Sequence, residues 1–185
     1  MGRLDEDGFV RLFRENPCKK IVDASHPFAR IVTETVRRAA ARENIPYERY
    51  ERAGMQYAYD RLHSVKDTTE AIGLLNAMAG NILLTTGVNT AGEYMAGVKG
   101  AKERLFIRVL DNASSYEGCA KAGYPAEHVF GEMPPFTVED NLRLIRETNA
   151  QMMVSKDSGK SGGVDIKVEA CRQAGIDFIL IRRPV

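Results

Sequence analysis

The chain has 185 residues, and its 26 Lys and Arg side chains nearly balance its 25 Asp and Glu side chains, which leaves a formal net charge of +1. This balance gives no electrostatic basis for a nucleic-acid partner, and a composition of 44% hydrophobic and 28% charged residues excludes collagen-like and disordered classes. No apolar run approaches the roughly 20 residues of a membrane span, and the N-terminus shows no signal segment, so we expect a cytoplasmic protein without a membrane partner.

Short apolar segments alternate with helical patterns along the chain, an order typical of βα units and a mostly parallel sheet. The patterns predict helices over 5–15, 27–44, 67–79, 89–98, 114–122, 138–149 and 164–174, and strands over 20–23, 47–51, 82–86, 105–110, 128–131, 152–155 and 178–182. Uninterrupted apolar runs such as residues 82–84 suit strands that helices cover on both faces. We expect Asp67 and Thr137 to be N-caps, and Gly123 and Gly175 to end helices in the left-handed conformation.

The periodic pattern lapses over residues 52–65, which we interpret as a crossover between two lobes. The predicted fold class is α/β, with two Rossmann-like lobes that have mostly parallel sheets. Residues 1–53 would be the remainder of an N-terminal α/β lobe and residues 54–185 a C-terminal α/β lobe. Only two strands precede the crossover, too few for a self-sufficient lobe, so we expect the N-terminal lobe to be incomplete.

Ligands of open parallel sheets bind beyond the carboxyl ends of the strands, and the first such end here carries Asp23, Ser25 and His26. A helix that starts at Pro27 would disfavour a charged imidazole at its mouth, so we expect a neutral His26 that Asp23 could orient. The alternative is that Ser25 only caps the helix and Asp23 only accepts hydrogen bonds from loop amides.

The second strand end carries Thr85, Thr86 and Gly87, where two hydroxyls and a glycine allow a ligand, an anion above all, to approach the backbone closely. A simple turn with Asn89 as N-cap explains the same residues.

The third strand end is the loop from Ser155 to Gly163, which precedes a helix. Its polar and small residues are Lys156, Asp157, Ser158, Gly159, Lys160, Ser161, Gly162 and Gly163. Backbone N–H groups of such a loop can form a nest for phosphate or carboxylate, and the two lysines add positive charge.

Several other motifs are excluded or carry no chemistry. A P-loop would need a glycine where Val154 stands, and no dinucleotide Gly-x-Gly-x-x-Gly fingerprint occurs. His63 and His128 have no partners at metal-ligand spacing, so we expect surface or loop histidines and no metal site. The three cysteines are odd in number and widely separated, which favours reduced thiols over disulfides.

Taken together and in this order, several segments resemble the precorrin-6A reductase family, including its cobalt-precorrin-6A members. They are Asp23-Ala24-Ser25-His26-Pro27-Phe28-Ala29, Ile45-Pro46-Tyr47-Glu48-Arg49, Leu84-Thr85-Thr86-Gly87, Arg108-Val109-Leu110, and Ser155-Lys156-Asp157-Ser158-Gly159 with Gly162-Gly163 and Lys167. The family begins with a strand and a glycine-rich turn that this sequence does not show, which again implies an incomplete N-terminal lobe.

The resemblance implies a reductase of cobalamin biosynthesis that uses NADPH or NADH to reduce one double bond of the tetrapyrrole precorrin-6A, or its cobalt form, to precorrin-6B. By position, Asp23, Ser25, His26, Lys156 and Asp157 are candidates for catalysis, with water open as the proton donor. Residues Thr85 to Gly87 are candidates for the cofactor, and Ser158 to Gly163 for carboxylates of the substrate. The sequence does not indicate the oligomeric state.

Two other functions remain open at this stage. The first is a non-catalytic α/β module that binds a tetrapyrrole or another polyanion, which the missing glycine-rich turn favours. The second is a phosphosugar- or nucleotide-binding domain, which the Ser/Gly loop alone would allow.

Overall fold

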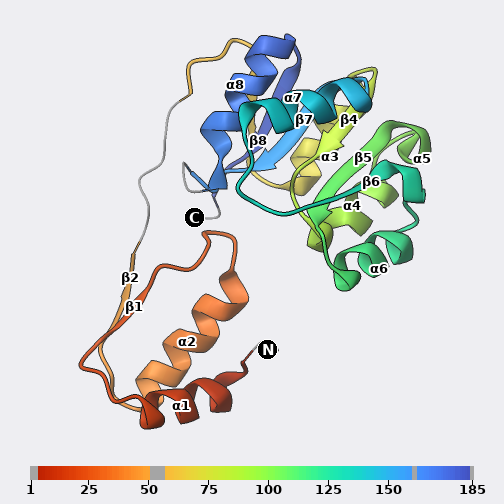
Figure 1. Ribbon diagram of the computed structural model, residues 1–185. Helices are drawn as coiled ribbons and strands as arrows, with labels where there is room; N and C mark the ends of the chain where they lie inside the picture. The colour runs from red at the N-terminus through yellow and green to blue at the C-terminus, as the bar shows by residue number, and fades with distance from the viewer. Residues whose placement is uncertain (1–3, 51–56, 160–161, 184–185) are drawn as a thin grey trace. The chain divides into compact units, whose positions relative to one another are not determined.

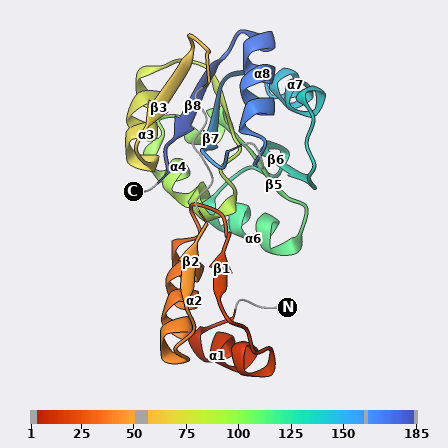
Figure 2. The same cartoon turned by 90° about the vertical axis from the view of Figure 1, so that its left-hand side faces the viewer.

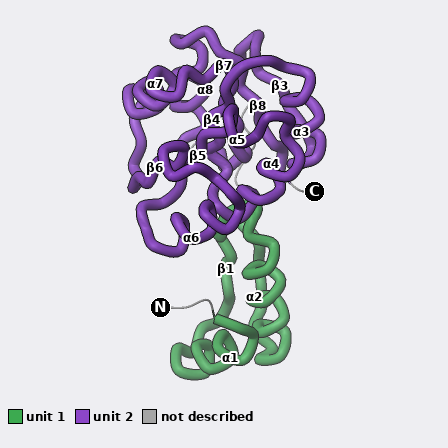
Figure 3. The backbone as a smooth tube through the Cα atoms, turned by 90° about the vertical axis from the view of Figure 1, so that its right-hand side faces the viewer, with its two compact units in different colours: residues 1–53 green, residues 54–185 purple. Residues whose placement is uncertain are grey.

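A computed structural model of the chain describes residues 4–50, 57–159 and 162–183 (Figure 1). The chain divides into two compact units, residues 1–53 and residues 54–185, which Figure 3 colours green and purple. Each unit is described by itself below. Every helix among the described residues is too short or too polar to cross a bilayer.

Unit 1 pairs two helices with a two-stranded parallel sheet. Its elements are α1 (Glu6–Glu15), β1 (Ile21–Asp23), α2 (Arg30–Arg42) and β2 (Tyr47–Arg49). Its small core consists of Val10 and Phe13 from α1 and Ala39 and Ala40 from α2, all less than a tenth exposed. Val10 and Phe13, three residues apart on one face of α1, thus pack against the adjacent Ala39 and Ala40 of α2, as expected for amphipathic helices.

Unit 2 is built on a six-stranded sheet in which every neighbouring pair is parallel, in the order β3-β8-β7-β4-β5-β6. The strands are β3 (Leu62–Val65), β4 (Asn81–Leu84), β5 (Leu105–Leu110), β6 (Val129–Glu132), β7 (Ala150–Lys156) and β8 (Asp177–Ile181). The predicted α/β class with a mostly parallel sheet is confirmed.

Helices cover both faces of this sheet, as Figure 2 shows for α3 and α4 on one side and α7 and α8 on the other. The helices are α3 (Thr68–Ala77), α4 (Ala91–Gly97), α5 (Ala101–Arg104), α6 (Ala113–Ala122), α7 (Val138–Glu147) and α8 (Val164–Ala174), with short 3₁₀ helices η1 (Val88–Thr90) and η2 (Ala126–His128). Parallel βα units bury the sheet on both faces in this way.

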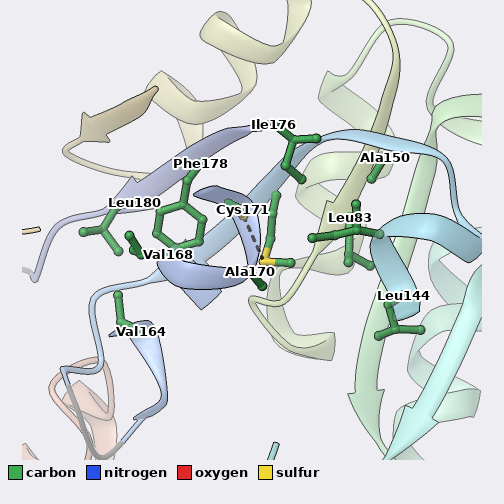
Figure 4. Packing of buried hydrophobic residues seen from close by; sticks show 12 residues of the cluster. Leu83, Leu144, Ala150, Val164, Val168, Ala170, Cys171, Ile176, Phe178 and Leu180 are labelled. Atoms are coloured by element: carbon green, nitrogen blue, oxygen red, sulfur yellow. Dashed lines mark hydrogen bonds between the residues drawn. The ribbon is translucent and has the colours of Figure 1, made fainter. Parts of the chain in front are cut away.

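The core under α7 and α8 explains why the strands read as continuous apolar runs. Three neighbouring strands direct apolar side chains toward Cys171 and its neighbours on α8: Leu83, Met153, Phe178 and Leu180. Figure 4 labels all of these except Met153. Residues that alternate with these point to the opposite face. Ile82 and Leu84 are fully buried there as well, so β4 is apolar on both faces.

The structure corrects several predicted bounds. The helix expected over 27–44 begins at Arg30, because the residues after His26 form a turn in which the Ala29 amide donates to the His26 carbonyl. The described end of the expected crossover contains strand β3, which the sequence analysis missed along with the short helix α5. The expected caps are confirmed: Asp67 accepts from the Glu70 amide, and Thr137 forms a capping box with Asp140.

Candidate functional site

The carboxyl ends of β4 and β7 mark the point where the order of strands in unit 2 reverses. From β4 the chain proceeds through β5 to β6 on one side, then returns to β7 on the other side of β4 and ends with β8. The helices that follow β4 and β7 lie on opposite faces of the sheet (Figure 2). Open α/β sheets bind ligands in the crevice that such a reversal leaves between two strand ends.

Both strand-end segments that the sequence analysis selected in unit 2 flank this switch point. Thr85 follows β4 and remains attached to β7, because its backbone N–H and its hydroxyl both donate to the Val154 carbonyl, at 2.9 and 2.8 Å. Leu84 aligns with Val154 on one side and with Ile107 on the other. One residue further, Thr85 therefore lies in a row between Ser155 and Arg108, on the face that α7 and α8 cover.

The turn after Thr85 leaves room for a ligand. Gly87 has a φ of 79°, which a side chain would strain, and a Cβ built on it would meet no atom within 4 Å. Thr86 is buried and its hydroxyl accepts from Thr90. The simple turn with Asn89 as N-cap does not form, because Gly87 precedes η1 and Thr90 precedes α4.

In the loop after β7, most described amides already have partners. The N–H groups of Ser158, Gly159 and Gly162 donate to the Lys156 carbonyl, the Asp157 carboxylate and the Gly159 carbonyl, at 2.8, 3.2 and 3.0 Å. These amides therefore do not form the open nest that the sequence suggested. The positive character of the loop comes instead from lysine side chains.

Lys167, on the first turns of α8, lies beneath this loop. Its ammonium donates to the Ser155 hydroxyl at 3.1 Å and to the Gly162 carbonyl at 3.2 Å, and the residue is only 7% exposed. Burial first, and the nearby Arg108 guanidinium second, lower its pKa from 10.5 to about 8. Among the described residues, no carboxylate forms an ion pair with Lys167.

Two further cations lie near the strand ends. Lys156, the last residue of β7, is partly buried; burial lowers its pKa, and the charge of Glu93 on α4 opposes that shift. Arg108 on β5 is 5% exposed, donates to Asn141 at 3.1 Å and stacks on Phe136 at 3.9 Å. Its burial lowers its pKa to about 10.

Asp157 has a structural partner in this loop. Its carboxylate lies 3.3 Å from the Nε atom of Arg183, and its backbone N–H donates to the Ile181 carbonyl at 2.8 Å. The same carboxylate accepts the Gly159 amide. Asp157 thus fastens the loop to the end of β8, and Lys160 and Ser161 lie outside the described residues.

In unit 1, Asp23 at the end of β1 holds the loop that carries Ser25 and His26. The buried carboxylate accepts the Ser25 amide at 2.9 Å and the Tyr47 hydroxyl at 2.8 Å, and pairs with Arg49 at 2.8 Å. Burial alone would raise the pKa of Asp23, but the hydrogen bonds from Ser25, Tyr47 and Thr33 outweigh it and hold the pKa far below its usual value. Arg49 also donates to the Ser25 hydroxyl and carbonyl, at 2.8 and 3.0 Å.

His26 is exposed at the tip of this loop. Its Nδ1 atom accepts the Phe28 amide at 3.2 Å, and its ring lies 5.7 Å from the ring of Phe28. An accepting Nδ1 requires a lone pair, so this contact suits a neutral imidazole with its proton on Nε2. The argument from a helix that starts at Pro27 was wrong, however, because α2 begins at Arg30, three residues after the predicted start.

The structure therefore gathers Thr85, Thr86 and Gly87 with the described residues of the loop after β7 in unit 2, while Asp23, Ser25 and His26 form a cluster in unit 1. Sequence reasoning gave no site role to Lys167 or Arg108. The signal for Lys167 was a lysine on the apolar stripe that Val164, Val168 and Cys171 define on α8. Among the described residues, no group of three or more His, Cys, Asp or Glu side chains could hold a metal ion.

A parallel sheet that carries a glycine turn and buried cations at its switch point defines an α/β protein of the class that binds anionic ligands at strand ends. A model of the family "Precorrin-6x reductase CbiJ/CobK" matches residues 1–185, the whole chain. The chain belongs to this family of cobalamin-biosynthesis reductases, and the predicted resemblance is confirmed.

Relatives with established names agree. Over 185 residues the chain is 37% identical to a cobalt-precorrin-6A reductase of Priestia megaterium, covering all of this chain and 72% of the relative. It is 34% identical to the Methanothermobacter thermautotrophicus cobalt-precorrin-6A reductase, covering 99% of this chain and 60% of the relative. A solved structure titled CobK precorrin-6A reductase superposes with a TM-score of 0.77 at 24% identity, covering all of this chain and 72% of that one, which shows a shared fold.

Proposed function

We propose that this chain takes part in the nicotinamide-dependent reduction of one double bond of precorrin-6A or cobalt-precorrin-6A, giving precorrin-6B or its cobalt form. The observation that supports this most is the switch point at the ends of β4 and β7, where an open glycine turn lies near buried cations. Both proposed ligands are anionic, because the tetrapyrrole bears carboxylates and the cofactor bears phosphates. Membership of the reductase family supplies the reaction class.

The residues at this switch point suit a nicotinamide cofactor, NADPH or NADH. Gly87 has open space where a Cβ would stand, so a ligand can approach the backbone of the Thr85 to Gly87 turn. The cofactor would supply the hydride to an electrophilic ring carbon. The chain would hold the cofactor through that turn and would hold carboxylates of the substrate through the loop from Ser158 to Gly163, including Lys160 and Ser161.

Reduction also needs a proton for the adjacent carbon, and the side chains differ in their suitability as donors. Asp23 remains ionised because its hydrogen bonds hold its pKa low, so within this proposal it positions Ser25 and His26. The ammonium of Lys156, whose pKa burial lowers, is the better candidate, and His26 would donate as an imidazolium, because a neutral imidazole that lost its proton would become an imidazolate. Asp157 shapes the loop through Arg183.

Anaerobic turnover tests the proposal directly. We would incubate the protein with NADPH or NADH and with precorrin-6A or cobalt-precorrin-6A, and follow the loss of nicotinamide absorbance together with the spectrum of the tetrapyrrole. We expect one cofactor molecule to be oxidised for each tetrapyrrole that is reduced. Bound tetrapyrrole without oxidation of either cofactor would instead identify a binding module and refute the proposed reaction.

A further inference from the structure

The chain buries the charge of Lys167 in a place where no acidic side chain neutralises it. The ammonium has two neutral acceptors, the Ser155 hydroxyl and the Gly162 carbonyl. Buried charges in proteins are normally paired, because burial without a counter-ion is costly. The charge of a lysine in this position therefore destabilises the folded state. A residue retained at such a cost points to a role for its charge.

The other groups that face this ammonium do not remove the imbalance. Arg108 on β5 is a second buried cation, with Glu132 as its own partner at 3.8 Å, and it repels the ammonium, while Asp165 on the same helix as Lys167 favours the charged form. Cys171 is a buried thiol whose pKa burial raises, so it stays neutral and offers no counter-charge. Asp165 contributes least of these groups to the shift at Lys167 and is not among its ion-pair partners.

The position of Lys167 in the fold connects this charge with the switch point. Ser155, Thr85 and Arg108 form a row across β7, β4 and β5 on one face of the sheet, at the level where β4 ends, and the Lys167 ammonium contacts Ser155. Its second acceptor, Gly162, lies just before α8. A Cβ on Gly162 would come within 1.7 Å of the Ser158 hydroxyl, so the loop after β7 packs tightly at that point.

We propose that Lys167 is a positioning residue for an anionic group of the ligand: its ammonium joins Ser155 to Gly162 and supplies the charge that a carboxylate or phosphate neutralises when it binds at the ends of β4 and β7. This inference deepens the proposed function and rests on the same switch point. The fixed hydrogen bonds orient the loop, and the uncompensated charge provides the attraction. Because most loop amides already have partners, this charge replaces the backbone nest as the source of affinity.

Proton uptake on binding tests the inference with a signal that a purely structural lysine would not give. In the free protein at pH 8, Lys167 is about half protonated, so an anion that stabilises the ammonium should draw in up to about half a proton. We would measure this by calorimetry in buffers of different ionisation enthalpy. The probes are NADPH, which carries phosphates, and uroporphyrin III, which carries carboxylates only.

Lys167→Met should bind the probe roughly tenfold more weakly and show no proton uptake, since a hydrogen bond or contact to a charged group is lost. Lys121→Met, at an exposed lysine on α6, is the matched control and should behave as the unmodified protein does. Ser155→Ala keeps the ammonium and should keep the uptake. Circular dichroism would establish that each variant is folded.

The outcomes distinguish a phosphate from a carboxylate as the bound anion, and they distinguish failure of the proposed reaction from failure of the role of Lys167. Uptake with NADPH alone would assign the charge to a phosphate, and uptake with uroporphyrin alone to a carboxylate; either supports the inference. Absence of uptake with both probes in the unmodified protein, or undiminished uptake in Lys167→Met, would overturn it. Uptake without any turnover in the anaerobic assay would refute the proposed reaction and leave the role of Lys167 standing.

Discussion

Replacing Lys167 by methionine should change how the stability of the protein depends on pH. Burial lowers the pKa of this lysine from 10.5 to about 8, and at about 1.4 kcal/mol per unit the folded state pays about 3 kcal/mol to keep the ammonium at pH 7. Between the two pKa values the unfolded chain binds more protons, so this cost decreases as pH rises through 8. From pH 7 to pH 9 the relief amounts to about 1 kcal/mol.

Methionine removes the whole pH-dependent cost but also the hydrogen bonds to Ser155 and Gly162, which offsets part of the gain by about 1 to 3 kcal/mol. The decisive quantity is therefore the difference in unfolding free energy between the variant and the unmodified protein, measured by urea denaturation at both pH values. Buried tyrosines titrate alike in both proteins, and burial keeps the Cys171 thiol protonated in both although Lys167 lowers its pKa slightly, so these contributions largely cancel. We expect the difference to shrink by about 1 kcal/mol from pH 7 to pH 9; an unchanged difference would refute the assigned burial cost.

Three further predictions concern the two clusters. Asp23→Asn should destabilise unit 1 by about 3 kcal/mol, since it leaves Arg49 without its buried partner; hydrogen exchange of unit 1 amides in the full chain measures this, and the exposed Glu48→Gln, expected to cost less than about 1 kcal/mol, is its control. Gly87→Ala should lower cofactor affinity at a stability cost of about 1 to 3 kcal/mol, because a φ of 79° with a ψ of 168° is a conformation essentially reserved for glycine. Gly123→Ala, in the left-handed conformation at the end of α6, should cost about 1 kcal/mol of stability and leave affinity intact; equal affinities would remove the Gly87 turn from the cofactor site. His26→Asn should leave the melting temperature unchanged and lower the turnover rate, and a variant of full activity would exclude His26 as proton donor.

Apolar runs were sufficient to predict the central strands, because the middle residues of β4, β7 and β8 are buried on both faces and are apolar. The edge strand β3 was missed for the opposite reason. It pairs with β8 alone, and His63 and Ser64 interrupt its apolar pattern. His63 is held there by Asp177 at 2.8 Å, a contact between residues more than a hundred positions apart that no local pattern contains.

The start of α2 shows how a local rule can mislead. Proline is common in the first turn of helices, yet Pro27 lies in a turn that precedes the helix. In this turn the Ala29 amide donates to the His26 carbonyl and the Phe28 amide donates to the His26 ring. In the loop after β7, local hydrogen bonds likewise occupy the amides that composition alone suggested would bind an anion. Composition located both segments but could not show which of their donors remain available.

The transfer of a labelled hydride tests the central claim most directly. NADPH carrying deuterium at the transferable position would be incubated anaerobically with cobalt-precorrin-6A and this protein, and the tetrapyrrole would be analysed by mass spectrometry. Reduction at a site of this chain predicts a product that carries one deuterium, formed by the unmodified protein and more slowly by Gly87→Ala. A tetrapyrrole that remains unreduced in the presence of the folded protein, or a reduced product without deuterium, would contradict the account.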